Sequence, residues 1–311
     1  MRHIDPHVHC RDGKEEYKTN IRKVSEAAEK QEIVAILDMA RVFTEKQAQE
    51  RIALAKMRQP SIAYFFYARL TTDQNQIAEA VKVVNNYPPA VGLKLRAVDV
   101  PREKDLKRVY RTLVKLNYTG LLAVHCQKAS RFKPELWNPW QPWTHYLVQP
   151  PAAEIESVAE QINFAKMSQF PGHLHICHIS CHKSVNLVCK ARKKLRISCG
   201  ITPHHLKWSS EKMKEPGGLF YKCDPPLAIE AEVLLLREDL KNGKIDWIET
   251  DFAPHTLQEK LKPPYLSGIA DYSLYSDVLE WLRQQGIKEE TIENLTYGNI
   301  KKVFGQKLEG V

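Results

Sequence analysis

The chain has 311 residues, 43% of them hydrophobic, which suffices for one large domain or two ordinary ones. It contains no apolar run near the roughly 18 residues of a membrane span. Its first residues include no apolar segment of the kind that a secretory signal needs. Lys and Arg number 46 against 37 Asp and Glu, but the two signs alternate along the chain. We therefore expect solvated helix faces and an attraction for small anions, with no nucleic-acid binding and no membrane binding.

The predicted elements alternate between short strand-like apolar runs and amphipathic stretches. In chain order, the strand and helix of each pair cover residues 3–9 and 15–30, 33–37 and 45–57, 62–67 and 77–85, 91–95 and 104–116, 121–125 and 153–167, 173–179 and 183–193, 195–199 and 230–240, and 245–251 and 272–284. Eight such pairs predict parallel strands with crossover helices in a (β/α)8 TIM barrel, with a doubly wound sheet as the alternative. We expect residues 1–311 to form a single domain.

Two connections are long, residues 127–151 and 202–227. The first carries Trp137, Trp140 and Trp143 in a Pro-rich setting. A spacing of three matches the polyproline II turn, which predicts three aligned indoles. The segment is interpreted either as an active-site lid or partner surface, or as a loop packed onto the barrel rim.

Several polar residues stand where catalytic groups collect in a barrel. His7 and His9 alternate on the first strand, so both imidazoles point to one side. The other candidates stand at the ends of apolar strands and are Lys94, His125, His178 and Asp251. Imidazole and carboxylate ligands predict two divalent metal ions, with Zn²⁺ expected. The Lys94 ammonium has no lone pair, so Lys94 would join the site as a carbamate formed with CO₂.

Five segments in this order resemble motifs of the amidohydrolase superfamily and, within it, of the dihydroorotases. They are DPHVH (residues 5–9, followed by Arg11), LAVH (122–125), HICHIS (175–180), TPHHL (202–206) and TDFAPH (250–255). The resemblance runs from about residue 3 to residue 305. The combination of motifs is highly specific, although each motif alone is not.

The resemblance implies a role for each candidate. His7, His9 and Asp251 would hold one metal ion, His125 and His178 the second, and carboxylated Lys94 would bridge them. The ions would activate a water molecule as nucleophile. Asp251 would then take its proton and deliver it to the leaving nitrogen. Arg11 and His255 match family positions that bind the substrate carboxylate.

The chain departs from the family pattern at the expected substrate pocket. Arg41 and Asp224 each stand where many dihydroorotases have Asn, and Ala228 stands where they have Arg. We expect Arg11, Arg41 and His255 to lie together at the mouth of the barrel. Asp224 would either accept hydrogen bonds from ring N–H groups or pair with Arg41.

The position of the first motif predicts a bare barrel. The HxH pair begins at residue 7, so the N-terminal strands that build a side β-sandwich in larger relatives are not expected.

Residues beside the motifs are given structural roles. Strand alternation predicts that Cys10, Cys126 and Cys177 point away from the site and pack under the helices as small hydrophobic side chains. His204 or His205 is expected to orient a metal ligand. An odd count of seven cysteines favours a reducing cytoplasm over a disulfide framework.

Three hypotheses for the function follow. The first is a binuclear metal hydrolase that interconverts dihydroorotate and N-carbamoyl-L-aspartate in pyrimidine biosynthesis. The second is the same chemistry on another small anionic substrate, a different cyclic ureide or imide. The third is a non-catalytic barrel that binds a partner enzyme, as dihydroorotase-like subunits can with aspartate transcarbamoylase. A homo-oligomer is compatible with each of them.

Overall fold

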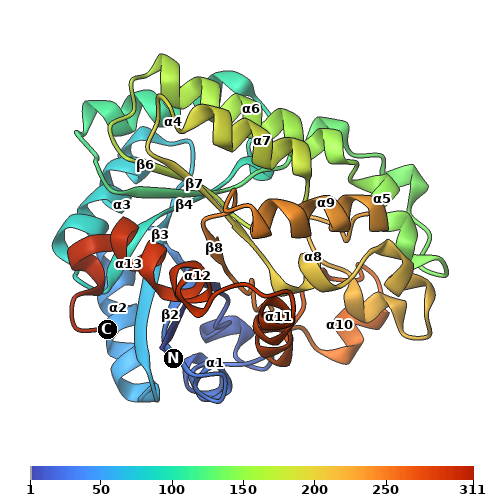
Figure 1. Cartoon of the computed structure of the whole chain (residues 1–311). Coiled ribbons are helices and arrows are strands. Elements are labelled where there is room, and N and C mark those ends of the chain that lie inside the picture. Colours follow the sequence, from blue (N-terminus) through green and yellow to red (C-terminus); the bar gives the residue numbers. More distant parts are fainter. Residues whose placement is uncertain (1) are drawn as a thin grey trace.

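The computed structural model describes residues 2–311 and contains a ring of parallel strands surrounded by helices (Figure 1). The strands pair in sequence order from β1 to β8. They are β1 (His3–Val8), β2 (Ile33–Val42), β3 (Ala63–Arg69), β4 (Ala90–Arg96), β5 (Leu121–His125), β6 (His173–Ile176), β7 (Ile197–Ile201) and β8 (Trp247–Ile248). A parallel bridge from Val8 to Phe252 joins the end of β1 to the segment after β8, so the sheet is nearly closed. The predicted (β/α)8 barrel is confirmed, and within residues 2–311 all eight strands belong to this one sheet.

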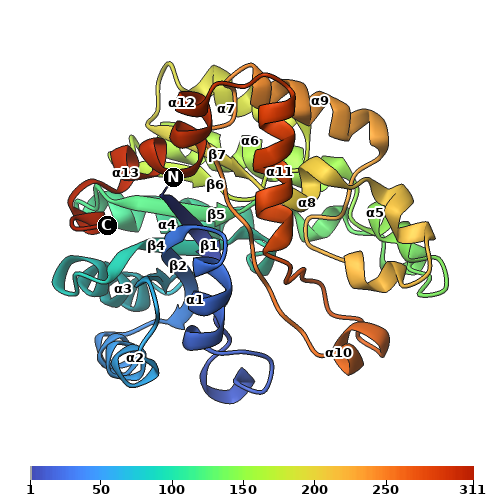
Figure 2. The same ribbon diagram turned by 60° about the horizontal axis from the view of Figure 1, so that its bottom comes forward.

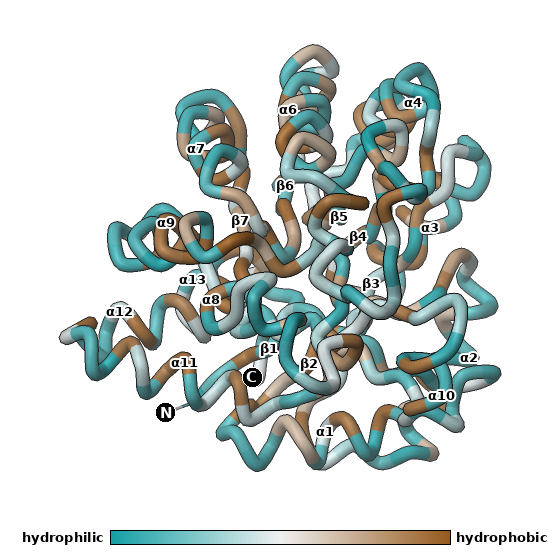
Figure 3. Tube along the Cα trace, turned by 90° about the vertical axis from the view of Figure 1, so that its right-hand side faces the viewer, coloured by the Kyte–Doolittle hydropathy of each residue, from teal (hydrophilic) through white to brown (hydrophobic). Residues whose placement is uncertain are grey.

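Eight long helices follow the strands, as the sequence predicts. They are α1 (Ile21–Glu29), α2 (Glu45–Arg58), α3 (Gln74–Asn86), α4 (Glu103–Lys115), α6 (Pro151–Met167), α7 (His182–Ala191), α9 (Glu230–Lys241) and α11 (Ser273–Gln284). The shorter helices are α5 (His145–Val148), α8 (Pro203–Lys207), α10 (Leu257–Leu261), α12 (Glu289–Glu293) and α13 (Asn299–Phe304). The long helices lie around the strands in Figures 2 and 3. No helix in the described part of the chain is both long and apolar enough to cross a membrane.

Several predicted boundaries are wrong, and the two largest shifts are at the start of the first long helix and at the end of β2. The first long helix begins at Ile21 and not at residue 15, because the Asn20 side chain accepts a hydrogen bond from the Lys23 N–H at 3.0 Å and caps the helix there. Strand β2 continues five residues beyond the predicted end, to Val42. The extra residues include Arg41, which is thereby carried to the barrel mouth.

The barrel has an outer and an inner core. The outer core packs the strands against the helices. The inner core fills the barrel away from the carboxyl ends of the strands and is closed by α13. There the Phe304 ring centroid lies 6.3 Å from that of Tyr67 and 6.4 Å from that of Trp247. Trp247 is fully buried. Apolar packing thus stabilises one end of the barrel, which leaves the carboxyl ends of the strands for polar side chains.

The three tryptophans of the first long connection do not align, so that expectation is wrong. Pro134 and Pro142 begin 3₁₀ turns, which bend the segment away from polyproline II geometry. The Trp137 ring lies 5.7 Å from the His145 ring, and Trp143 packs against a small apolar cluster at the rim. Trp140 is 92% exposed. The interpretation as a loop packed on the rim is confirmed for Trp137 and Trp143.

Gly200 of β7 provides the space for the Glu249 side chain inside the barrel. A Cβ atom at residue 200 would lie 2.5 Å from the Glu249 carboxyl carbon and 2.9 Å from Trp247 Nε1. Since overpacking a core typically costs about 1–3 kcal/mol, we expect Gly200→Ala to lower the free energy of unfolding by about that amount in urea titrations. The control is the same change in a Glu249→Ala background, where the clash is relieved. An equal loss in both backgrounds would contradict this explanation.

Candidate functional site

All six predicted metal ligands line one cavity of roughly 130 Å³ at the carboxyl ends of the strands. They are His7, His9, Lys94, His125, His178 and Asp251. They come from or directly follow β1, β4, β5, β6 and β8. Parallel strands bring residues far apart in sequence to the same edge of the barrel, which is why strand-end polarity identified them.

His7, His9 and Asp251 form the first ligand group. His7 Nε2 lies 3.3 Å and His9 Nε2 3.1 Å from the same oxygen of Asp251. Val8, between the two histidines, is fully buried in the outer core, so alternation on β1 places both imidazoles inside the barrel. Asp251 adopts a left-handed backbone conformation with φ 48°. Two imidazole nitrogens and one carboxylate oxygen that converge in this way fit a divalent cation.

His125 and His178 form the second group. His125 Nδ1 lies 3.0 Å from His178 Nε2, and His125 Nε2 donates to the Gln127 amide oxygen at 3.0 Å. His178 Nδ1 is buried and has no hydrogen-bond partner. The Gln127 contact therefore fixes the His125 tautomer with its Nδ1 lone pair facing His178. Imidazoles with uncommitted lone pairs also fit a metal ion.

Most of these groups have the protonation states that metal ligands need at neutral pH. Burial and the nearby Arg11 lower the pKa of His9 to about 4, and burial with Arg96 lowers that of His125 to about 3. Burial alone would raise the pKa of Asp251, but His7 and His9 hold it well below its usual range. His7 differs, because burial and Lys94 lower its pKa but Asp251, Cys177 and Glu249 together raise it to about 9. Cation binding at His7 would therefore release a proton.

Glu249 is a functional residue that sequence reasoning missed. Its carboxylate is buried and accepts hydrogen bonds from His175 Nε2 at 3.0 Å, Trp247 Nε1 at 2.9 Å and the His178 backbone N–H at 2.5 Å. It also lies 3.4 Å from His7 Nδ1. Strand alternation could have identified it, because Glu249 precedes Asp251 by two residues and side chains two apart on a strand face the same side.

The predicted outward position of Cys177 is wrong. Its sulfur accepts a hydrogen bond from Lys94 Nζ at 3.1 Å and belongs to the inner core. His175 contacts Glu249 inside the barrel and Ile176 packs in the outer core, so alternation itself places Cys177 inside. The residue that departs from alternation is His178, where φ is 36° and the side chain also faces the cavity. Cys10 and Cys126 lie in the outer core, as expected.

The expected carboxylate-binding residues lie at the barrel mouth. Arg11 Nη2 donates to His255 Nε2 at 3.2 Å. Burial and Arg11 lower the pKa of His255 to about 4, so the imidazole is neutral and accepts this bond. Arg41 lines the same cavity as Arg11, with its side chain 70% exposed and 3.4 Å from Glu15. Arg11 and Arg41 thus line one cavity, whereas His255 contacts Arg11 and does not itself line it, and their role in carboxylate binding stays a prediction.

Asp224 does not pair with Arg41, so that alternative is wrong. Its Oδ1 accepts hydrogen bonds from His145 Nε2 at 2.9 Å and from Gln149 Nε2 at 3.0 Å. Burial would raise the pKa of Asp224, but His145 and Lys222 hold it well below its usual range. The long connection 127–151 therefore contributes to the cavity wall by fixing an ionised carboxylate.

Arg69 and Arg96 also line the cavity and were missed. They stand at the ends of β3 and β4, the criterion that selected Lys94. Cross-strand register places Arg69 beside Lys94 and Arg96 beside His125.

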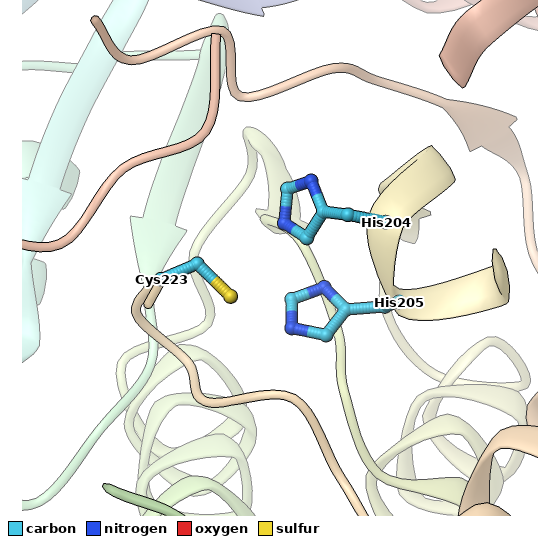
Figure 4. A group of neighbouring side chains, drawn as sticks. All are labelled: His204, His205 and Cys223. Carbon is cyan, nitrogen blue, oxygen red and sulfur yellow. The ribbon is translucent and has the colours of Figure 1, made fainter. Parts of the chain in front are cut away.

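A separate buried group lies behind Asp251 and consists of His204, His205 and Cys223 (Figure 4). Both imidazoles come from α8 and point toward the cysteine sulfur. His205 already uses both ring nitrogens, with Thr202 Oγ1 at 2.7 Å and the Pro225 carbonyl oxygen at 3.0 Å. His204 Nε2 is buried without a partner, and His204 helps to lower the pKa of Asp251. The expected orienting role of His204 or His205 stays a prediction, because neither imidazole hydrogen-bonds a proposed metal ligand in the described part of the chain.

The sequence is similar to curated dihydroorotases. No protein-family model matches the chain. It is 28% identical to the dihydroorotase of Lactobacillus acidophilus over 265 residues, which cover 83% of this chain and 61% of that relative. It is 28% identical to the dihydroorotase of Methanothermobacter thermautotrophicus over 320 aligned residues, which cover 99% of this chain and 70% of the relative. The chain thus spans about three fifths of the length of the Lactobacillus relatives it matches.

The fold is similar to that of solved hydantoinases. The dihydropyrimidinase of Brevibacillus agri has a TM-score of 0.84 at 21% identity, covering 98% of this chain and 70% of that chain. The L-hydantoinase of Arthrobacter aurescens has a TM-score of 0.83 at 19% identity, covering 97% and 70%. At such identities the likeness shows the fold alone. Together with the dihydroorotase relatives, it confirms the resemblance drawn from the motifs.

Glu154 of α6 holds the segment after β6 in place, and its protonation makes the stability of the fold depend on pH. It accepts hydrogen bonds from the backbone N–H and hydroxyl of Ser180, at 3.0 and 2.5 Å, and burial raises its pKa to about 7. Since the folded-state pKa lies above the unfolded value, folded protein binds more protons between about pH 4.5 and 7, and stability falls as pH rises through that window.

We therefore expect that, between pH 5 and pH 8, the free energy of unfolding of the wild type falls by about 1–3 kcal/mol more than that of Glu154→Gln, as measured by unfolding titrations. The exposed Glu135→Gln serves as the matched control. A wild-type minus Glu154→Gln difference that does not change with pH would contradict the raised pKa.

Proposed function

We infer that this chain, a dihydroorotase-like member of the amidohydrolase superfamily, is a metal-dependent hydrolase of a cyclic amide that carries a carboxylate. Dihydroorotate, with N-carbamoyl-L-aspartate as the product, is the first candidate, because the sequence relatives described above are named dihydroorotase. One observation carries the proposal: six side chains of ligand type converge from five strands in one cavity with an arginine mouth. We propose that residues 1–311 act as one hydrolase unit in the cytoplasm, within pyrimidine biosynthesis.

The side chains fit two divalent ions, for which we propose Zn²⁺. His7, His9 and Asp251 would hold one ion and His125 and His178 the other. Bound ions would polarise the amide carbonyl and make water nucleophilic at neutral pH. Lys94 lies in the same cavity but offers no lone pair as an ammonium, so we propose that it bridges as a carbamate.

Asp251 is the proposed proton carrier. Its carboxylate is ionised at neutral pH and held between two imidazoles, so it can accept a proton on the cavity side. It would then deliver that proton to the nitrogen that leaves as the ring opens. His204 behind it lowers the pKa of Asp251, which keeps the base free between turnovers.

Arg11 is the proposed anchor for the substrate carboxylate. The neutral His255 accepts one guanidinium N–H, which orients the remaining donors toward the cavity. Arg11 Nε is buried without a hydrogen-bond partner, so a donor is available. Arg41 adds a second, more exposed charge.

A second candidate is the same chemistry on another carboxylated cyclic amide. The observation that favours it is the replacement of two family asparagines by Arg41 and Asp224, both of which line the cavity. Homo-oligomerisation, or association with aspartate transcarbamoylase, is compatible with either candidate and stays part of the proposal.

We expect Asp251→Asn to lose about 10²–10⁴-fold in kcat while the barrel stays folded, because an amide cannot act as a base at neutral pH. Hydrolysis assays, circular dichroism and metal analysis, with two equivalents expected in the wild type, check this. The exposed Asp277→Asn on α11 is the matched control. Near-normal turnover by metal-loaded Asp251→Asn would remove Asp251 from the proton-transfer role.

We expect the wild type to hydrolyse dihydroorotate in preference to the uncharged rings dihydrouracil and hydantoin, because arginines surround the cavity. Arg41→Asn should reduce kcat/KM for dihydroorotate by about tenfold or less, since the exposed Arg41 is screened by solvent. Arg131→Asn, exposed and outside the cavity, is the control. A wild-type preference for the uncharged rings would refute the carboxylate pocket. Dihydroorotase activity found only in Arg41→Asn would show that the chain uses another substrate.

A further inference from the structure

Arg69 and Arg96 lie inside the barrel mouth because of strand register. Arg69 of β3 pairs with Lys94 of β4, and Arg96 of β4 pairs with His125 of β5. Residues side by side on neighbouring strands point to the same face of a sheet. Lys94 and His125 face the cavity, so both guanidiniums face it too, and both line it. No role in metal binding or proton transfer uses them.

The two arginines share one carboxylate. Asp99, 53% exposed, accepts a hydrogen bond from Arg69 Nη2 at 3.0 Å and lies 3.6 Å from Arg96 Nε. Arg96 Nε makes no hydrogen bond although the atom is buried. This pair therefore carries one net positive charge and one unsatisfied donor.

The pair Arg11 and Arg41 likewise has one neighbouring carboxylate and one unsatisfied guanidinium donor. Arg41 lies 3.4 Å from Glu15, and Arg11 Nε is a second buried donor without a partner. The four guanidiniums repel one another, since Arg41 lowers the pKa of Arg11 and Arg96 lowers that of Arg69. Glu15 and Asp99 are the salt-bridge partners of these four arginines, so each pair keeps one guanidinium charge that no such partner balances.

The other carboxylates of the cavity form no salt bridge with these arginines. Asp224 accepts from His145 and Gln149, and Asp251 lies between His7 and His9. Both are therefore committed to other partners. Two separate guanidinium pairs, each with an unused buried donor, suit a ligand with two anionic groups.

We propose that Arg69 and Arg96 form a second anion-binding subsite, so that the cavity prefers dicarboxylates over monocarboxylates. This inference rests on the proposed function only in placing one carboxylate at Arg11. Two sources supply such a ligand: a ring-opened N-carbamoyl dicarboxylate, or a cyclic amide that carries two carboxylates.

The test compares isosteric ligands by calorimetry. N-carbamoyl-L-aspartate and N-carbamoyl-L-asparagine differ only in replacing the side-chain carboxylate by an amide. Hydantoins that carry one or two carboxylates form the ring series. The wild type should bind the dicarboxylate of at least one series about tenfold or more tightly than its monocarboxylate partner. The series that shows the preference identifies the source.

The double variant Arg69→Gln, Arg96→Gln should lose that preference while its affinity for the monocarboxylate changes less than about threefold. Arg131→Gln, which removes an exposed arginine outside the cavity, should keep it. No preference in the wild type, or an equal loss for both ligands in the double variant, would overturn the proposal. Binding and hydrolysis are measured separately, so a wild type that hydrolyses no cyclic amide yet binds dicarboxylates selectively would refute the proposed function and leave the subsite standing.

Discussion

The buried carboxylate of Glu249 is the interaction on which the arrangement of the site depends. An ionised carboxylate inside a barrel is costly unless it is paired and hydrogen-bonded. Glu249 has an imidazole, an indole N–H and a backbone N–H as donors. Burial alone would raise its pKa, but His175 and His7 hold it well below its usual range.

The backbone bond from Glu249 to the His178 N–H has a structural consequence. His178 adopts a positive φ of 36°, which a non-glycine residue keeps only where its surroundings fix it. Glu249 accepts at that residue and also lies beside His7, so one carboxylate positions ligands from both proposed metal sites. The absence of a side chain at Gly200 makes the space for it.

Sequence patterns predicted this fold well because their signals are local. Alternation and helical periodicity located all eight strand–helix pairs, alternation on the first strand located two ligand candidates, and strand-end polarity located the other four. The failures occurred where local rules stop. His178 follows the end of β6 with a positive φ of 36°, so it faces the cavity although the preceding Cys177 also lies inside the barrel. The partners of Asp224 come from residues about 75 positions away, on a loop whose path no periodicity encodes.

The architecture separates chemistry from selectivity. The groups proposed for metal binding and proton transfer lie inside the barrel and are fixed by carboxylates and strand geometry. The arginines lie at the rim and pair with the more exposed Glu15 and Asp99. We therefore expect a substitution at the rim to leave the inner groups in place, because the histidine ligands are held by other residues and not by Arg41. By the motif resemblance, Arg41 and Asp224 stand where many dihydroorotases have asparagine while the proposed metal ligands are kept. We therefore expect that substrate choice can change in this barrel without a change in the reaction.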